Sequence, residues 1–241
     1  MSLDGKLVLI TGSAERIGHA LALAVAHAGA DVVIHYSGSQ TAAENTRAEI
    51  EALGRKAMLV QADLADPAQA GGLIGRVLEH APLFALVNNA AIFEALTWET
   101  TGLEDWHRHL AINLTAPFLL SQAFARALPP HGTGRIVNLL DWRSQRPGAD
   151  HLPYTVSKAA LAALTQSLAV ALAPQVNVNG LALGAALPPS DGSAVPHILD
   201  NVPAGRWAAI EEIGQALIFL LDGPAYITGE IIHVDGGRHL V

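Results

Sequence analysis

Seven apolar runs of strand length, each separated from the next by a longer segment, constrain the fold of this chain most strongly. Most runs are short and rich in valine, isoleucine and leucine, which is typical of strands buried on both faces. The intervening segments have helical patterns, and this alternation predicts right-handed crossovers and one parallel sheet. We therefore expect an α/β doubly wound architecture with helices on both faces. The seven expected strands are 6–11, 31–36, 57–61, 84–88, 134–139, 175–179 and 230–234.

Length and composition favour a single domain, residues 1–241, of an ordinary cytoplasmic enzyme. A chain of 241 residues, 51% of them apolar, can form a large core between two helical layers. The net charge of −8 and the lack of a basic run argue against nucleic acid and membrane surfaces as partners. Cysteine is absent, and the 11 histidines form no metal-binding pattern. The start has no signal-peptide regions, and no uncharged apolar run reaches spanning length.

One irregular region, residues 185–205, interrupts the alternation. It holds Pro188, Pro189, Pro196 and Pro203, and it follows the carboxyl end of an expected strand. Ligands bind at that end of parallel strands, so we favour a substrate lid. A structural loop without a role in binding is the alternative.

The first expected strand runs directly into a glycine turn and then a helix. Gly12 and Gly18 bracket the turn, and an alanine- and leucine-rich helical pattern follows. Strand, glycine turn and helix are the context that a dinucleotide-binding turn requires, because backbone N–H groups can approach a pyrophosphate there. Only two of the usual three glycines are present, so a plain turn between strand and helix is an equal alternative.

Tyr154 and Lys158 stand four residues apart in an expected helix, so their side chains share one face. An ammonium group beside a phenol favours the phenolate, and we expect it to lower the pKa of Tyr154 and make it a usable proton donor. A surface tyrosine beside a solvated lysine is the usual alternative for an isolated pair of this kind.

With these motifs the chain resembles the short-chain dehydrogenase/reductase family over nearly its whole length. The resemblance implies a Rossmann fold, an NAD(P) cofactor and catalysis by Tyr154, Lys158 and Asn113, the last holding a water that feeds protons to the lysine. The matching segments are Thr11-Gly12 to Gly18, Asp63-Leu64, Asn88-Asn-Ala-Ala91, Asn113, Tyr154 with Lys158, Ile227-Thr-Gly229 and Asp235-Gly-Gly237. The residues implied to bind the cofactor are Gly12, Arg16, Ile17, Gly18, Ser37, Ser39, Asp63, Leu64, Asn89, Ala90, Tyr154 and Lys158.

Three departures from the family pattern resemble its pteridine reductase and dihydromonapterin reductase branch. Asp141 replaces the serine thirteen residues before Tyr154, Arg16 replaces the middle glycine of the turn, and Phe93 follows the Asn-Asn segment. Gly236 to Leu240 also looks like the end of dihydromonapterin reductases. The resemblance implies reduction of a C=N bond in a pterin-like small molecule such as dihydromonapterin, dihydrobiopterin or dihydrofolate. Tyr154 would donate the proton with help from Asp141, and Arg16 and Phe93 would hold the ring.

Two other functions stay open. A general carbonyl or 3-oxoacyl reductase could carry aspartate at position 141, and the loss of the serine could instead mark a nucleotide-binding sensor without turnover. A carboxyl with a pKa raised by burial can support proton transfer, so we favour catalysis. Phe93 could simply be a core residue, but its position at the expected carboxyl edge of the sheet favours stacking on a substrate.

The end of the second expected strand favours NADPH over NADH. An NAD site usually has an acidic residue there for the ribose hydroxyl, and this chain has His35-Tyr-Ser-Gly-Ser39. Ser37 and Ser39 could accept a 2′-phosphate. Glu15 argues against this choice because a carboxylate repels a phosphate, so NAD(H) is not excluded.

Two long expected helices, 101–128 and 153–173, have further consequences. Pro117 has no N–H to bond the carbonyl of Asn113, so we expect a kink in the first helix and a free carbonyl near the site. A simple bend around the core is an equal alternative. The second helix has alanine and leucine on most faces, more than one core contact needs, which predicts an oligomer. The family resemblance implies a homotetramer.

Overall fold

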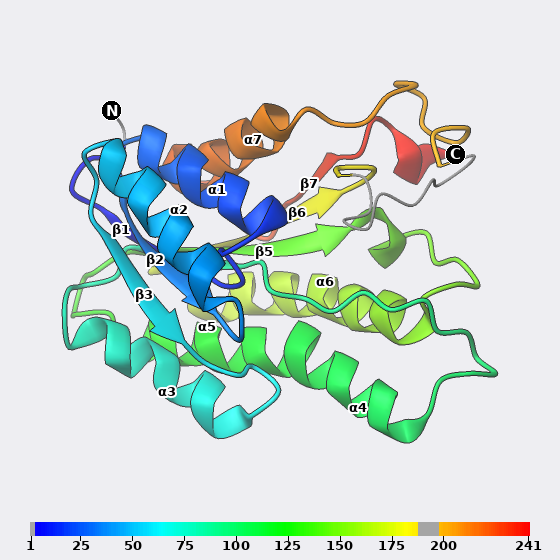
Figure 1. Ribbon diagram of the computed structural model, residues 1–241, viewed down its shortest axis with the longest axis horizontal. Coiled ribbons are helices and arrows are strands. Elements are labelled where there is room, and N and C mark those ends of the chain that lie inside the picture. Colours follow the sequence, from blue (N-terminus) through cyan, green and yellow to red (C-terminus); the bar gives the residue numbers. More distant parts are fainter. Residues whose placement is uncertain (1–2, 188–197) are drawn as a thin grey trace.

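A seven-stranded, fully parallel sheet organises the molecule (Figure 1). The computed structural model describes residues 3–187 and 198–241. The strand order is β3-β2-β1-β4-β5-β6-β7, so the chain winds outward in both directions from β1, as in a Rossmann fold. The strands are β1 (Leu7–Ile10), β2 (Asp31–Tyr36), β3 (Ala57–Gln61), β4 (Ala85–Asn88), β5 (Gly134–Asp141), β6 (Val176–Leu183) and β7 (Ile231–Val234).

Helices cover both faces of the sheet (Figure 1). One layer holds α1, α2 and α7, and α3 to α6 form the other. The α-helices are α1 (Arg16–His27), α2 (Gln40–Ala52), α3 (Pro67–Leu78), α4 (Leu103–Leu110), α5 (Ala116–Ala127), α6 (Leu152–Leu172) and α7 (Ile210–Asp222). The predicted single-domain α/β architecture is therefore confirmed.

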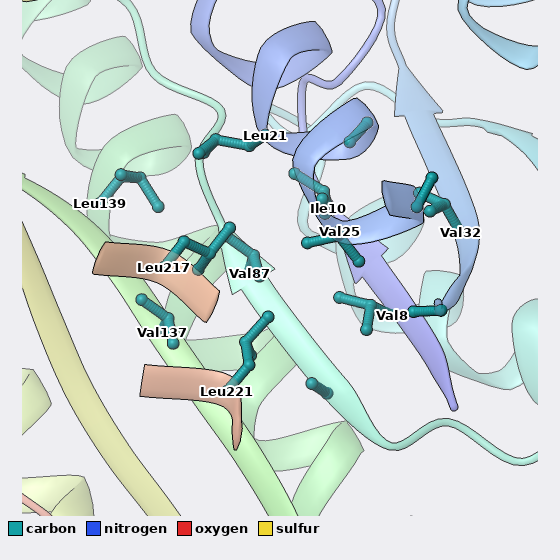
Figure 2. Close-up of a cluster of buried hydrophobic side chains, with 14 of the residues drawn as sticks. Val8, Ile10, Leu21, Val25, Val32, Val87, Val137, Leu139, Leu217 and Leu221 are labelled. Atoms are coloured by element: carbon teal, nitrogen blue, oxygen red, sulfur yellow. The ribbon is translucent and has the colours of Figure 1, made fainter. Parts of the chain in front are cut away.

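The side chains of each central strand alternate between two hydrophobic cores. On β1, Val8 and Ile10 point into the core beneath α1 and α7, while Leu9 belongs to the core on the opposite face. Figure 2 shows the first core, where Leu217 and Leu221 of α7 meet the strands. Burying a side chain of this size contributes about 2 kcal/mol. This double burial explains why the strands read as continuous apolar runs.

All seven predicted strands are present, but β5 and β6 extend beyond their predicted ends at 139 and 179. They pair along eight residues, up to Asp141 opposite Leu183. A polar residue and a glycine disguise these extensions in the sequence. Gly180 fits because a β-carbon there would lie 2.5 Å from the Leu140 side chain. The extra length carries Asp141 to the carboxyl edge of the sheet.

The predicted helix 101–128 is interrupted, which confirms the expected irregularity near Pro117. Between α4 and α5, residues Ala111–Thr115 form a π-helical turn, in which Ala116 N–H donates to Ala111 O. Pro117 has no N–H to donate to the Asn113 carbonyl, so the regular helical bond is missing beside this turn. Asn113 lies inside this turn and is completely buried.

Two other predictions concern the substrate lid and the possibility of a membrane-spanning helix. The lid predicted at 185–205 lies partly outside the described residues, since 188–197 are not described, and it stays a prediction. Among residues 3–187 and 198–241, α6 is the one helix long and apolar enough to cross a membrane, judged by length and composition. Core helices pass the same test, and α6 packs on β5 and β6 with Lys158 buried inside.

Candidate active site

The carboxyl end of β5 and the first turn of α6 bring Asp141 and Tyr154 together. The Tyr154 hydroxyl donates to Asp141 Oδ2 at 3.1 Å, and both side chains are largely buried. The strand delivers Asp141, and the helix presents Tyr154 and Lys158 on one face because they are one turn apart. The contact expected between the phenol and the carboxyl is therefore present, although thirteen residues separate the two positions.

Lys158 is buried and donates from Nζ to the Leu139 carbonyl oxygen at 2.6 Å. Its ammonium also lies 5.8 Å from the centre of the Tyr154 ring. Burial lowers the pKa of Lys158 to about 8, with the Asp141 carboxylate acting in the opposite direction. The amine thus fixes the end of β5 against α6 and places its charge below the phenol.

The prediction that Lys158 lowers the pKa of Tyr154 is wrong. Burial raises the pKa of Tyr154 well above its ordinary value, and the Asp141 carboxylate raises it further by its charge and its hydrogen bond. Burial also raises the pKa of Asp141, against the opposing effects of Arg143, Tyr154 and Lys158. A low-dielectric site disfavours charged forms, and this outweighs the opposing effect of the Arg143 charge on the phenol. Tyr154 therefore keeps its proton.

Asn113 holds the segment after β4 in place. Its side-chain oxygen accepts from Ile92 N–H at 2.9 Å, and its Nδ2 donates to Ile92 O at 3.1 Å and to Ser157 Oγ at 3.0 Å. These three bonds join the π turn, the segment 89–93 and α6. The side chain thus positions Phe93 as well as the start of α6. That Asn113 holds a water molecule which supplies protons to Lys158 stays a prediction.

Phe93 is not a core residue, since 55% of its surface is exposed. Its ring meets the Tyr154 ring edge to face, with centres 4.6 Å apart and planes at 78°. Its ring also stacks on His151, with centres 4.0 Å apart and planes within 7°. An exposed aromatic ring beside the proposed proton donor is suited to contact a flat substrate.

Sequence reasoning missed the loop between β5 and α6. Arg143 Nη2 donates to Asp150 Oδ2 at 2.6 Å, and His151 Nδ1 donates to the same oxygen at 2.8 Å. The guanidinium carbons of Arg143 and Arg238 lie 4.7 and 4.5 Å from the centre of the Trp142 ring. No spacing pattern signals these residues, because they meet only through the path of the loop and the return of the C-terminal segment.

The glycine turn after β1 is built as a dinucleotide site requires. Gly12 has φ +62°, and a β-carbon on Gly18 would lie 2.0 Å from the Gly12 oxygen, so neither position accepts a larger residue without distortion. Asn89 Nδ2 donates to the carbonyl oxygens of Thr11 and Gly12, at 2.8 and 3.1 Å. The Thr11 hydroxyl accepts from Asn89 and Ala90 N–H at 2.9 and 3.0 Å. The ends of β1 and β4 are thereby locked together beside the first turn of α1.

Arg16 and Ile17 occupy this first turn with different roles. Arg16 is exposed and keeps a left-handed backbone, with φ 55°, at the position where the family usually has glycine. Ile17 packs against the core beneath α1. The turn therefore preserves the glycine conformation while it carries a cationic side chain at the surface.

His35 was not predicted as part of this turn. It is buried at the end of β2, and its Nδ1 accepts from Gly12 N–H at 3.0 Å. Its Nε2 lies 3.1 Å from Ala62 O. The ring therefore connects the glycine turn to the end of β3, and the buried imidazole, whose pKa burial lowers to about 4, stays neutral.

The remaining predicted cofactor residues lie beyond the ends of β2 and β3. Ser37 is exposed and its carbonyl accepts from Gln61 Nε2 at 2.8 Å, while Ser39 precedes α2 without using its hydroxyl as a cap. Asp63 Oδ1 accepts from Ala65 N–H at 2.9 Å, and Leu64 is buried. The carboxyl edge thus presents small and polar groups that fit a nucleotide.

Comparisons with known proteins match this geometry. A family model described as enoyl-(acyl carrier protein) reductase matches residues 12–239. A 3-oxoacyl-[acyl-carrier-protein] reductase of Synechocystis sp. is 34% identical, and the alignment covers 98% of both chains. The structure of the FolM alternative dihydrofolate reductase 1 from Brucella canis, complexed with NADP, has 34% identity and a TM-score of 0.90, covering 100% of this chain and 97% of that one.

A short-chain dehydrogenase from Burkholderia cenocepacia, in complex with NADP, is 36% identical with a TM-score of 0.90, and the match covers 99% of each chain. These matches span the whole sheet, the glycine turn and the Tyr154–Lys158 helix. The chain belongs to the short-chain dehydrogenase/reductase family of oxidoreductases.

Proposed function

We propose that this protein is an NADPH-dependent reductase of the C=N bond of a dihydropteridine. The observation that carries the proposal is the 3.1 Å hydrogen bond between Tyr154 and the buried carboxyl of Asp141. A second support is Phe93, whose exposed ring lies against Tyr154 at the mouth of the site. The similarity to alternative dihydrofolate reductases of two Brucella species adds a third.

Reduction of a C=N bond needs a hydride on carbon and a proton on nitrogen. Bound NADPH would supply the hydride at the carboxyl edge of the sheet. Tyr154 is protonated at neutral pH, because burial and Asp141 raise its pKa, so it can donate to the ring nitrogen. After this transfer, solvent can protonate the Asp141 carboxylate, whose pKa burial raises, and Asp141 can pass that proton to the phenolate along their hydrogen bond. Lys158 stabilises the phenolate that forms when the proton leaves.

Arg16 and Phe93 would hold the flat ring, and Asn113 would hold a water molecule that supplies protons to Lys158. Arg16 stands on the exposed side of the glycine turn, and Phe93 borders Tyr154. Asn113 fixes both the Phe93 segment and α6 through Ile92 and Ser157. The water that Asn113 is expected to hold belongs to this proposal.

For the cofactor we propose NADP(H), with NAD(H) as the alternative. No acidic residue ends β2, and Ser37 and Ser39 offer hydroxyls for a 2′-phosphate. Similar proteins from Brucella and Burkholderia bind NADP in their structures. The exposed Glu15 opposes this choice. Fluorescence titration of both cofactors tests it, and tighter binding of NADH would refute it.

A 3-oxoacyl or general carbonyl reductase is the second candidate. The observation that favours it is the 34% identity to the Synechocystis 3-oxoacyl reductase. Ketone reduction needs the same phenol and amine but has no evident need for a carboxyl in place of serine. A nucleotide-binding sensor without turnover is the third candidate, and any substrate-dependent oxidation of NADPH excludes it.

A substrate panel with three variants separates these functions. The purified protein is assayed by NADPH absorbance with dihydromonapterin, dihydrobiopterin, dihydrofolate and acetoacetyl-coenzyme A. Asp141→Asn should lower the rate on dihydropterins about a hundredfold, the effect of losing a proton-transfer group. Asp141→Ser should leave ketone reduction intact, and Asp4→Asn, an exposed position, serves as the control. Faster turnover of the ketone than of any dihydropterin, with no effect of Asp141→Asn, would refute the pteridine proposal.

We also propose that the protein assembles as a homotetramer through its long helices. The helices concerned are α4 and α5, which form the predicted helix 101–128, and α6. Each has a large exposed apolar side chain: Leu103, Phe118 and Val170, and Val170 is 83% exposed. Burial of these side chains between subunits would remove apolar surface from water. Light scattering on the wild type and Val170→Glu tests the proposal. A charge buried at the interface should weaken the assembly, so the variant should have a lower particle mass than the wild type. A monomeric wild type would refute it.

A further inference from the structure

Asp150 lies beside the active site, where it contacts a guanidinium group and an imidazole ring. Its Oδ2 atom accepts from the Arg143 guanidinium at 2.6 Å and from His151 Nδ1 at 2.8 Å. The Asp150 side chain is 53% exposed, while those of Arg143 and His151 are only 14% and 17% exposed. The two donors are thus fixed in the wall of the site, and the carboxylate they share reaches them from the solvent side.

This carboxylate position adjoins the reacting groups. His151 stacks on Phe93 at 4.0 Å, and Phe93 contacts the Tyr154 ring at 4.6 Å. The backbone N–H of Arg143 donates to Asp141 Oδ1 at 2.8 Å. Contacts therefore run from Asp150 to the Asp141–Tyr154 hydrogen bond by two routes, so a group bound at the Asp150 position belongs to the same site as the reacting ring.

The surroundings have unused capacity to bind an anion. Arg143 Nε is buried and has no hydrogen-bond partner among the described residues. Arg238 and Arg143 both contact the ring of Trp142, and Arg143 contributes, after burial, to a lowered pKa of Arg238. Asp141, Asp150 and Asp235 act in the opposite direction. A negative group held near both arginines would offset their mutual repulsion.

We propose that Asp150 occupies the place of a substrate carboxylate, which Arg143 and His151 bind when the substrate enters. The occupant is a carboxylate because both donors already converge on one carboxylate oxygen. The Asp150 side chain is half exposed, so water can solvate its carboxylate when an incoming carboxylate takes its place on the two donors. This inference rests on the proposed function and narrows it. The preferred dihydropteridine carries an acidic tail, as dihydrofolate does, in place of the neutral side chain of dihydrobiopterin or dihydromonapterin.

The test is the ratio of kcat/KM for dihydrofolate to kcat/KM for dihydrobiopterin. Arg143→Gln should lower this ratio about tenfold, the loss of one charge-assisted hydrogen bond. Arg146→Gln, an exposed arginine of the same loop, is the matched control and should keep the wild-type ratio. Asp150→Asn should raise the ratio about threefold, because the resident charge no longer competes. Destabilisation alone would lower both kcat/KM values and leave their ratio unchanged. An unchanged ratio in Arg143→Gln would therefore overturn the proposal.

A second measurement separates this inference from the proposed function. Calorimetry measures binding of 4-aminobenzoylglutamate, an acidic tail without a pterin ring, to the wild-type protein saturated with NADPH. We expect saturable binding that weakens about tenfold in Arg143→Gln, and no binding of the neutral 4-aminobenzamide. If no dihydropterin is reduced but this binding is seen, the carboxylate site stands and the pteridine proposal fails. If dihydropterins are reduced but the acidic fragment does not bind, the inference fails alone.

Discussion

His35 should make the stability of the protein depend on pH between about 4 and 6.5. The ring is 2% exposed, and its Nδ1 accepts from Gly12 N–H, so its proton must lie on Nε2 and point to Ala62 O. Only the neutral imidazole can make both bonds. A second proton would place two N–H groups face to face at the glycine turn and would charge a buried ring.

The size of the effect follows from the pKa of His35, about 4 in the folded protein against 6.5 for an ordinary histidine. Between these values the unfolded chain binds a proton and the folded chain does not. The contribution of His35 to stability is therefore complete above pH 6.5, decreases as the pH falls, and is lost by about pH 4. At about pH 5 the loss amounts to about 2 kcal/mol, and at full protonation to about 3 kcal/mol.

Urea unfolding of the wild type and His35→Asn at one protein concentration isolates this contribution. Asparagine can accept from Gly12 N–H and donate to Ala62 O, but it does not titrate. Between about pH 7.5 and about pH 5 the free energy of unfolding should fall by about 2 kcal/mol more in the wild type than in the variant. Other groups shift both curves equally. Parallel curves would refute the assignment of a neutral, doubly bonded His35.

Two backbone predictions concern the glycine turn and the π-helical turn. Gly18→Ala should reduce cofactor affinity at least tenfold, because its β-carbon would lie 2.0 Å from the Gly12 oxygen, and Gly72→Ala, with open space around it, should bind normally and gain about 0.5 kcal/mol of stability. Titration with NADPH and urea unfolding measure both. Pro117→Ala restores an N–H that can bond the Asn113 carbonyl, so it should slow turnover several-fold while thermal stability stays within a few degrees; an unchanged rate would contradict a role for the π turn.

The sheet could be predicted from the sequence because double burial leaves a direct trace. Strands that are covered by helices on both faces are mostly apolar, and each apolar run found this way is a strand. β5 and β6 were predicted too short because each holds a residue that interrupts the apolar run. Asp141 is a polar residue kept at a strand end for the site, and Gly180 is small because Leu140 packs over it.

The site could be predicted only where its members have fixed spacing. Tyr154 and Lys158 share a helix face, so their proximity follows from helix geometry. Arg143, Asp150 and His151 meet through an irregular loop with a left-handed residue at His151, and no periodicity encodes that path. The direction of the Tyr154 pKa was missed for a related reason, since the degree of burial depends on tertiary packing.

The same burial gives the site its chemical character. It raises the pKa of Asp141, raises that of Tyr154 and lowers that of Lys158, so each group is shifted toward its uncharged form. With serine at position 141 the tyrosine would have a neutral hydroxyl neighbour, which cannot take up or release a proton near neutral pH. With aspartate, a carboxyl group that can exchange a proton with solvent lies 3.1 Å from the phenol. Any reduction by hydride transfer needs such a proton source, because the hydride donor brings no proton.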